Sequence, residues 1–144
     1  VLVVDDNPDD ALLIRRLLEA KKAYRVFHAA DGEAGLGQAR QRLPDLIVLD
    51  LTMPERDGFS VLEELKRDPR TSGIPVIVVS AKDITTEERR RLNGHIEAVY
   101  QKGSLSPRAF VEQVVQAVSP RRAWVLRDGP NGVLEDKPAR EEID

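Results

Sequence analysis

The chain has 144 residues, of which 41% are hydrophobic and 33% charged, and its formal net charge is −3. These values are typical of one globular domain with a short appendage, and the charge gives no basic footprint for nucleic acid. No apolar run approaches the roughly 18 residues of a membrane span. The lack of cysteine excludes disulfides and thiolate metal sites and favours a reducing, cytoplasmic location. Since the sequence starts inside a strand pattern without Met, we expect a piece of a longer protein.

The first ten residues, VLVVDDNPDD, join a short apolar run to two pairs of acids. Residues 1–4 predict a strand. Asn7 is a suitable helix N-cap and Pro8 a suitable first helical residue, so a helix is expected over residues 8–20. Asp9 and Asp10 fall in its first turn, where the helix dipole favours acids, and we assign them a structural role.

Four more apolar runs follow, each with a helical pattern after it. A capping box, Thr85 to Glu88, marks one helix start, and Ser106-Pro107 marks another. Near-continuous apolar strands alternating with helices predict an α/β fold, a (βα)5 doubly wound parallel sheet of five strands. The expected strands are 1–4, 24–29, 46–49, 75–79 and 98–101, and the later helices span 31–43, 59–68, 85–92 and 107–118.

Residues 119–144 break this pattern, so we expect a domain over residues 1–118 and a C-terminal extension over 119–144 that packs on the surface or binds a partner. Two arrangements are compatible with the extension. One is a short hairpin of WVL and VLE around DGPNG, and the other is a segment draped over the domain. Trp124 is expected to pack against the domain or a partner.

Polar residues follow four of the five predicted strands. They are Asp5 and Asp6 after the first strand, Asp50 after the third, Ser80 after the fourth and Lys102 after the fifth. Because the carboxyl ends of parallel strands meet at one edge of a sheet, where ligands of open α/β sheets bind, these side chains are expected to converge. A single acid there is ordinarily a helix N-cap, but the set of five indicates a site.

The residue types at this edge suggest phosphoryl transfer. Carboxylates without Cys or His suit Mg²⁺, which keeps open positions for phosphate oxygens. The hydroxyl of Ser80 and the ammonium of Lys102 suit the remaining phosphoryl oxygens. One carboxylate is left as a nucleophile, and Asp50 is the best candidate because it ends the central strand. The small Ala81 leaves an approach path.

The acid pair, DLTMPERDG, VSAKD and QKG, in this order and spacing, resemble the receiver (response regulator, CheY-like) domain of two-component phosphorelay systems over residues 1–118. The QKG ending resembles receivers of hybrid sensor histidine kinases. The resemblance implies a flavodoxin-like sheet with strand order 2-1-3-4-5. It also implies a domain that catalyses its own phosphorylation and dephosphorylation and so switches a face formed by the fourth helix, fifth strand and fifth helix.

The resemblance further implies roles for individual residues. Asp50 accepts the phosphoryl group from the phospho-His of a histidine kinase or phosphotransfer domain. Asp6 binds Mg²⁺ directly, Asp5 largely through water, and Thr52 through its backbone carbonyl. Thr52 also lies at a position that tunes self-dephosphorylation in the family.

Ser80 and Lys102 are implied to bind the phosphoryl oxygens. Ala81 and Lys82 lie where access and self-dephosphorylation are tuned, and Arg56 is expected to overhang the site.

Two positions depart from the family pattern. Gly103 follows Lys102 where receivers usually have Pro, so we expect a differently shaped loop. Val99 occupies the position of the aromatic switch residue, and Tyr100 comes one residue later. Neighbouring strand residues point to opposite faces, so the usual coupling between Ser80 and the tyrosine requires a bulge here.

Other functions remain as alternatives. One is an interaction module that has the same fold but works without phosphorylation. A Mg²⁺-dependent phosphatase of the haloacid dehalogenase type needs a second Asp where Asn7 stands. A flavin-binding domain needs a phosphate loop that DDNPDD does not provide. The output partner is not defined by the sequence, and a homodimer through the switching face or the extension is one of the alternatives.

Overall fold

Five parallel strands form one sheet in the order β2-β1-β3-β4-β5, which confirms the predicted fold. The computed structural model describes residues 1–20, 24–53 and 57–127, with side chains described up to residue 118. The strands are β1 (Leu2–Val4), β2 (Phe27–Ala29), β3 (Ile47–Asp50), β4 (Val76–Ser80) and β5 (Ala98–Gln101). The helices are α1 (Pro8–Glu19), α2 (Gly32–Arg42), α3 (Gly58–Arg67), α4 (Thr86–Leu92), the 3₁₀ turn η1 (Lys102–Ser104) and α5 (Pro107–Arg127).

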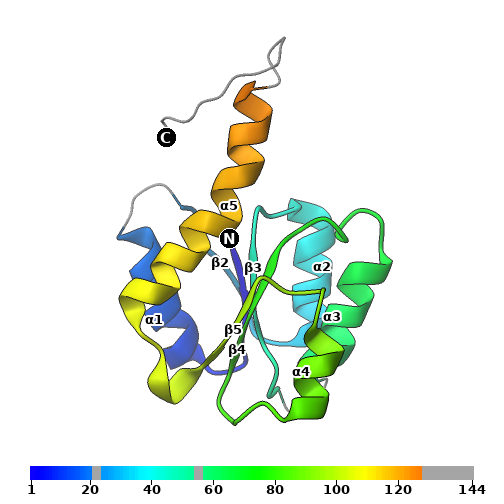
Figure 1. Ribbon diagram of the computed structural model, residues 1–144, viewed down its shortest axis with the longest axis vertical. Helices are drawn as coiled ribbons and strands as arrows, with labels where there is room; N and C mark the ends of the chain where they lie inside the picture. The colour runs from blue at the N-terminus through cyan, green and yellow to red at the C-terminus, as the bar shows by residue number, and fades with distance from the viewer. Residues whose placement is uncertain (21–23, 54–56, 128–144) are drawn as a thin grey trace.

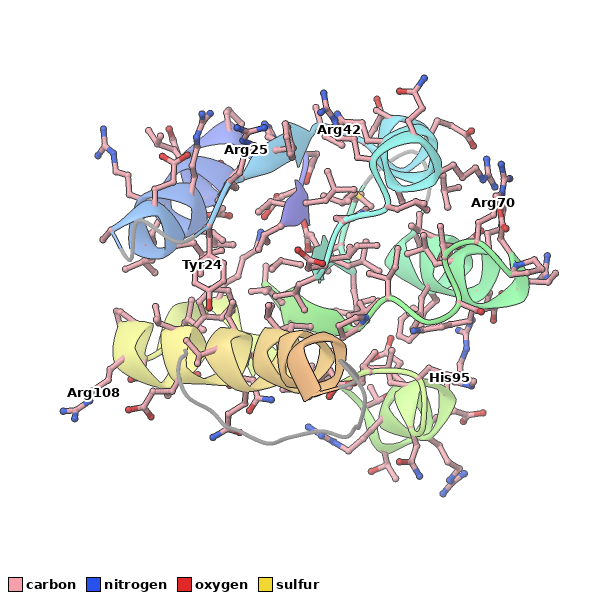
Figure 2. All side chains as sticks on the ribbon, turned by 90° about the horizontal axis from the view of Figure 1, so that it is seen from above. Tyr24, Arg25, Arg42, Arg70, His95 and Arg108 are labelled. Carbon is pink, nitrogen blue, oxygen red and sulfur yellow. The ribbon has the colours of Figure 1, made fainter. Side chains whose placement is uncertain are left out.

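The sheet has a separate hydrophobic core on each face. Helices α1 and α5 cover one face and α2, α3 and α4 cover the other (Figures 1 and 2). Strand residues alternate between them because successive side chains point to opposite faces. The core beneath α1 and α5 contains Val3, Val48, Ile77 and Val79. The core beneath α2, α3 and α4 contains Val4, Leu49 and Val78. Burial on both faces explains why the strands read as continuous apolar runs.

The predicted helix starts are confirmed by their caps. The Asn7 side chain accepts hydrogen bonds from two backbone amides of the first turn of α1, and the Asp57 side chain accepts one, from the Ser60 amide, at the start of α3. Thr85 and Glu88 form the reciprocal capping box of α4. These caps satisfy amide groups that have no partner inside the helix, and they fix where each loop at the carboxyl edge of the sheet ends.

Helix α5 runs from Pro107 to Arg127, so the boundary expected at residue 118 falls inside a continuous helix. The hairpin strand considered for Trp124–Leu126 is wrong, because these residues are helical. A helix that is already nucleated adds residues at little cost, and this outweighs the strand propensity of Trp and Val. The far end of α5 extends beyond the sheet (Figure 1). Residues 128–144 lie outside the described residues.

Among the described residues, no helix has both the length and the apolar content that crossing a membrane requires.

Gly58 begins α3 directly beneath the end of β3. A Cβ atom at this position would lie 2.6 Å from both the Asp50 carbonyl oxygen and the Leu51 Cα, and the Gly58 amide donates to the Leu51 carbonyl at 3.2 Å. The contact is with backbone, which cannot turn aside as a side chain can. Close packing of α3 against the strand that carries Asp50 therefore requires glycine here.

Substitution Gly58→Ala is expected to lower the free energy of unfolding by about 1–3 kcal/mol, because the added methyl group forces α3 away from β3. Gly37→Ala is the matched control, since Gly37 lies within α2 with open space around it. It should raise stability by about 0.5–1 kcal/mol through helix propensity. Urea denaturation measures both, and equal effects of the two substitutions would show that the close approach is not limiting.

Candidate functional site

The carboxyl edge of the sheet brings together Asp5, Asp6, Asp50 and Lys102, as the sequence predicts. One carboxylate oxygen from each of the three acids lies within 4.8 Å of the others. Asp5 and Asp50 are buried, each with 2% of its surface exposed, whereas Asp6 is exposed. Two buried carboxylates this close repel each other strongly unless a cation lies between them.

Asp5 is held by bonds to both oxygens of its side chain. Its Oδ1 accepts a hydrogen bond from the Asn7 amide at 2.9 Å, and its Oδ2 lies 2.9 Å from the Lys102 ammonium. Its backbone carbonyl accepts a hydrogen bond from His28 Nε2 at 2.8 Å. Burial raises the pKa of the Asp5 carboxyl, and the charge of Asp50 adds to this, while the Asn7 amide and Lys102 act against it. The site therefore favours a cation that keeps Asp5 ionised.

Asp50 presents its two oxygens differently. Its Oδ1 accepts two hydrogen bonds from Thr52, one from the amide at 3.0 Å and one from the hydroxyl at 2.9 Å. Its Oδ2 faces the Lys102 ammonium at 3.4 Å. Thr52 thus fixes the orientation of the carboxylate and leaves Oδ2 as the oxygen that points toward the cation.

Lys102 is the described cation at the centre of this cluster, with a side chain that is 16% exposed. Besides Asp5 and Asp50 it contacts a third acid, Asp10 of α1, whose Oδ2 lies 2.8 Å from its Nζ. Burial alone would lower the pKa of Lys102. The hydrogen bonds to Asp10 and Asp5 and the charges of Asp5 and Asp50 outweigh burial and raise it. Lys102 is therefore charged at every physiological pH.

Asp10 is the residue that the sequence analysis missed, because its place in the first turn of α1 suggested only a dipole role. It does lie in that turn. However, it precedes the buried Ile14 by four residues, so it stands on the face of α1 that covers the sheet. The four-residue spacing between Asp10 and Ile14 could have indicated this position. It was overlooked because Asp9, which is also acidic, lies beside Asp10 in the same turn.

The three acids fit a hard divalent cation. All their donors are carboxylate oxygens, which Mg²⁺ prefers. The three oxygens all lie within 4.8 Å of one another, so one small ion would be within reach of all of them. Lys102 contacts two of these three acids, Asp5 and Asp50, so an ion bound there would compete with its ammonium for their carboxylates.

Ser80 reaches the same edge but is turned toward the loop before α4. It is fully buried, and its hydroxyl donates to the Lys82 carbonyl at 3.0 Å and accepts from the Lys82 amide at 3.3 Å. The Lys82 ammonium points to Glu88 of α4, at 2.6 Å. Ala81 is exposed. The structure therefore brings Ser80 and Lys82 near the site without showing a bond to Asp50.

Arg56 lies outside the described residues, and no described contact involves the Thr52 carbonyl.

Val99 and Tyr100 face opposite sides of the sheet. Strand β5 pairs with β4 in continuous register, with Val99 opposite Val78 and Tyr100 opposite Val79, so no bulge reverses the alternation. Val99 packs on the core beneath α4, whereas Tyr100 packs edge-on against Phe110 of α5, with ring centroids 5.9 Å apart. The tyrosine therefore lies on the face away from Ser80 and α4.

Gly103 lies in the 3₁₀ turn η1, which follows β5 directly. Its φ is not in the left-handed region, and a Cβ would find open space. The shape of this turn therefore does not require glycine.

Comparison with known families agrees with this geometry. The sequence profile described as "Response regulator receiver domain" matches residues 1–113. The chain belongs to this family, the phosphoacceptor receiver domains of two-component signalling. The family typically uses Mg²⁺ in an acidic pocket.

Three curated relatives illustrate the range of proteins that carry such a domain. Protein PilH of Pseudomonas aeruginosa is 39% identical over 88 residues, which are 61% of this chain and 72% of PilH. The polar-differentiation response regulator DivK of Brucella anthropi is 37% identical over 79% of this chain and 91% of DivK. The response regulator PleD of Caulobacter vibrioides is 46% identical over 58% of this chain, but only 18% of PleD is covered.

Solved structures show the same fold. The N-terminal domain of a response regulator receiver protein from Methanoculleus marisnigri JR1 is 34% identical with a TM-score of 0.66, over 81% of this chain and 93% of that one. A CheY-like receiver domain protein from Methanospirillum hungatei JF-1 has a TM-score of 0.75 at 24% identity, over 84% and 94%.

Substitution Lys102→Met tests the electrostatic description of the site. It removes the ammonium but keeps the chain's length, which leaves buried Asp5 and Asp50 facing each other without a cation. Stability at pH 7.5 is expected to fall by about 3–5 kcal/mol. Burial already raises the pKa of the Asp5 carboxyl, and loss of Lys102 raises it further above the unfolded value. The loss of stability should therefore shrink as the pH falls toward 5 and Asp5 takes up a proton.

Urea denaturation at the two pH values, with and without Mg²⁺, measures this effect. Mg²⁺ should restore much of the stability at pH 7.5 by taking the place of the ammonium. Lys66→Met is the control, because it makes the same chemical change at a lysine that lies outside the acid cluster. A Lys102→Met protein that is equally destabilised at both pH values would contradict the description.

Proposed function

We propose that Asp50 is the phosphoacceptor of this receiver domain and takes the phosphoryl group from the phosphohistidine of a histidine kinase or phosphotransfer domain. The observation that carries the proposal is the environment of Asp50 Oδ2. That oxygen belongs to a buried carboxylate, is not engaged by Thr52, and faces an ammonium held among carboxylates. Nucleophile, cation and acids thus meet at one edge of the sheet.

In the proposed reaction Asp50 Oδ2 attacks phosphorus as the P–N bond of the donor breaks. The imidazole nitrogen keeps the bonding electron pair, and the new O–P bond is an acyl phosphate. Thr52 keeps the carboxylate in the attacking orientation through its two hydrogen bonds to Oδ1. Lys102 donates to a phosphoryl oxygen, and its raised pKa keeps it protonated while it does so.

Asp5, Asp6 and Asp50, with the Thr52 carbonyl, are the residues we propose to hold Mg²⁺. When bound, the ion neutralises the acids and the phosphoryl oxygens that otherwise repel each other. The hydrogen bond from the Asn7 amide to Asp5 Oδ1 restricts the orientation of the Asp5 carboxylate. Asn7 serves as this donor and as the cap of α1, and it stands where a haloacid dehalogenase phosphatase needs its second acid. This favours the receiver over the phosphatase.

Incubation with acetyl phosphate and Mg²⁺ tests the phosphoacceptor. The intact protein should gain the mass of one phosphoryl group, and Asp50→Asn should gain none because its amide oxygen is a poor nucleophile. Asp57→Asn is the control: it makes the same chemical change seven residues away, and Asn caps α3 as well as Asp does.

Two results would contradict the assignment. A phosphoryl group retained by Asp50→Asn places the acceptor elsewhere. No phosphoryl group on the unmodified chain, with Mg²⁺ bound, leaves the phosphorylation-independent interaction module.

We also propose how the site is connected to a partner-binding face. The Ser80 hydroxyl binds the Lys82 backbone, the Lys82 ammonium binds Glu88, and the Glu88 carboxylate caps Thr85 at the start of α4. If Ser80 turns to a phosphoryl oxygen, it releases the first bond of this series. Receivers work by shifting between two such arrangements, and here α4 is the element that moves.

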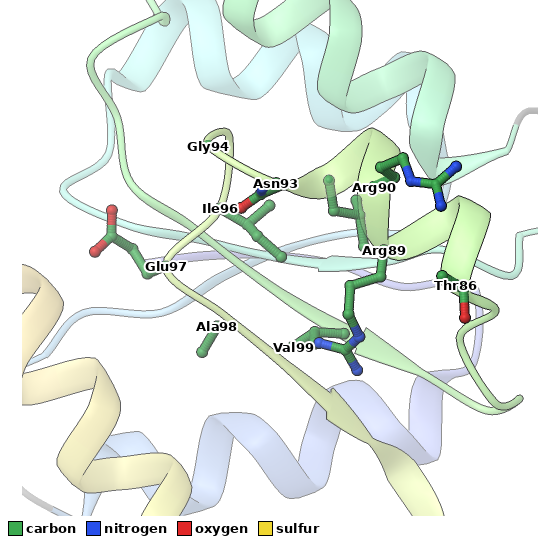
Figure 3. A pocket seen from close by; sticks show the side chains of 10 residues that line it. Thr86, Arg89, Arg90, Asn93, Gly94, Ile96, Glu97, Ala98 and Val99 are labelled. Atoms are coloured by element: carbon green, nitrogen blue, oxygen red, sulfur yellow. The ribbon is translucent and has the colours of Figure 1, made fainter.

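The surface beside α4, where this series of hydrogen bonds from Ser80 to Glu88 ends, has a concave region. A groove of about 470 Å³ lies between α4 and β5 and is lined by apolar Leu92, Ile96 and Val99 and by Arg89. Figure 3 shows the Arg89 side chain extending toward Val99. We propose that a partner segment with an apolar side chain beside a carboxylate binds this α4–β5 groove, because Val99 leaves space there and Arg89 offers a positive charge.

The described core supports a receiver domain that ends near residue 118. Val118 is buried against the sheet with 2% of its surface exposed, and α5 continues past the sheet to Arg127. We propose that this continuation, with the residues after it, forms the extension through which a second copy or an output partner binds.

The link to α4 is testable by NMR. Mg²⁺ with beryllium fluoride, a phosphoryl analogue, should shift the amide signals of Thr86–Leu92 as well as those at the strand ends. In Ser80→Ala the shifts at α4 should be lost while those near Asp50 remain. Ser72→Ala, which removes an exposed hydroxyl from the loop before β4, is the control. Shifts at α4 that survive in Ser80→Ala would contradict the link.

A further inference from the structure

The acid nearest to Lys102 is not the phosphoacceptor but Asp10. The Lys102 Nζ lies 2.8 Å from Asp10 Oδ2, 2.9 Å from Asp5 Oδ2 and 3.4 Å from Asp50 Oδ2. Asp10 comes from α1, and 92 positions of sequence separate it from Lys102. The ammonium that is proposed to bind the phosphoryl group therefore lies closer to Asp10 and Asp5 than to Asp50.

Asp10 is held in place by its own helix. The Asn7 side chain accepts a hydrogen bond from the Asp10 amide at 3.3 Å, and the first turn of a helix favours a carboxylate. Its carboxylate is 37% exposed, whereas those of Asp5 and Asp50 are 2% exposed. Water can solvate Asp10 when Lys102 leaves, so breaking this pair is cheaper than leaving Asp5 or Asp50 without a cation.

We infer that Asp10 is a positioning residue that offers Lys102 an alternative partner within the site. Lys102 withdraws to Asp10 when a divalent cation takes Asp5, and Asp10 competes with the phosphoryl group for the same ammonium. Asp10 thereby strengthens the binding of the metal ion and weakens the binding of the phosphoryl group. This inference rests on the proposed function of the site.

The inference predicts effects of opposite sign from one substitution. In Asp10→Asn the ammonium has no place to withdraw to and stays on Asp5, so Mg²⁺ binding weakens. Once Mg²⁺ is saturating, the same ammonium is free to bind a phosphoryl analogue, so binding of the analogue tightens. A substitution that only disturbed the fold would weaken both.

The experiment measures the two ligands separately on the full chain. Isothermal titration calorimetry gives the Mg²⁺ dissociation constant, and ¹⁹F NMR gives the beryllium fluoride concentration at half-saturation in excess Mg²⁺. For Asp10→Asn we expect Mg²⁺ binding about three- to tenfold weaker and beryllium fluoride binding tighter by a similar factor, as for a partly buried ion pair.

Asp9→Asn is the matched control, because Asp9 lies next to Asp10 in the same turn and its described hydrogen bond is made by its amide. It removes the same charge without the contact, so both constants should change less than twofold. Asp10→Glu keeps the charge on a longer side chain and should restore both constants toward those of the unmodified chain.

The outcomes separate this inference from the proposed function. Opposite shifts in Asp10→Asn, absent in Asp9→Asn, support the inference. Shifts of the same sign, no shifts, or equal shifts in both variants overturn it while the proposed function stands. An unmodified chain that binds Mg²⁺ but no beryllium fluoride, or neither ligand, overturns the proposed function and this inference with it.

Discussion

The site depends on one constraint: buried carboxylates at the end of a parallel sheet must share a cation. Asp5 and Asp50 are withdrawn from water, and in this structure Lys102 lies between them. Each such charge is expensive to bury alone, and the pair is tolerable only because the ammonium contacts both. In the proposed function, a metal ion and a phosphoryl group change which of these acids Lys102 contacts.

The sheet determines which residues take part in that redistribution. Parallel strands place all their carboxyl ends at one edge, and alternation sends Val99 toward α4 and Tyr100 toward α5. As a result, the tyrosine is separated from Ser80 by the sheet itself. The connection from the site to α4 instead follows polar groups, from Ser80 through Lys82 to the capping box of α4. This is the route that we propose for coupling the two regions in a chain without an aromatic residue at position 99.

Most of the fold, and most of the residues that meet at the carboxyl edge of the sheet, were predictable from the sequence because both depend on local patterns. Apolar runs, caps such as Asn7 and Thr85, and acids that follow strands are short-range signals. The misjudged elements depend on long-range contacts. Trp124–Leu126 are helical because α5 continues from a core built by other residues, and Asp10 meets Lys102 only after α1 packs on the sheet.

The sequence by itself determined the parallel α/β fold, the edge at which the polar residues meet, and the chemistry of phosphoryl transfer that they share. It did so because short stretches of sequence determine where each strand begins and ends and which residue types follow it. Only the tertiary structure decided that Lys102 contacts three acids, Asp5, Asp10 and Asp50. The same holds for the Ser80 hydroxyl, which bonds the backbone of Lys82 in the loop before α4. Contacts between segments that are distant in the sequence settle such choices, and these contacts follow from how the helices pack on the sheet.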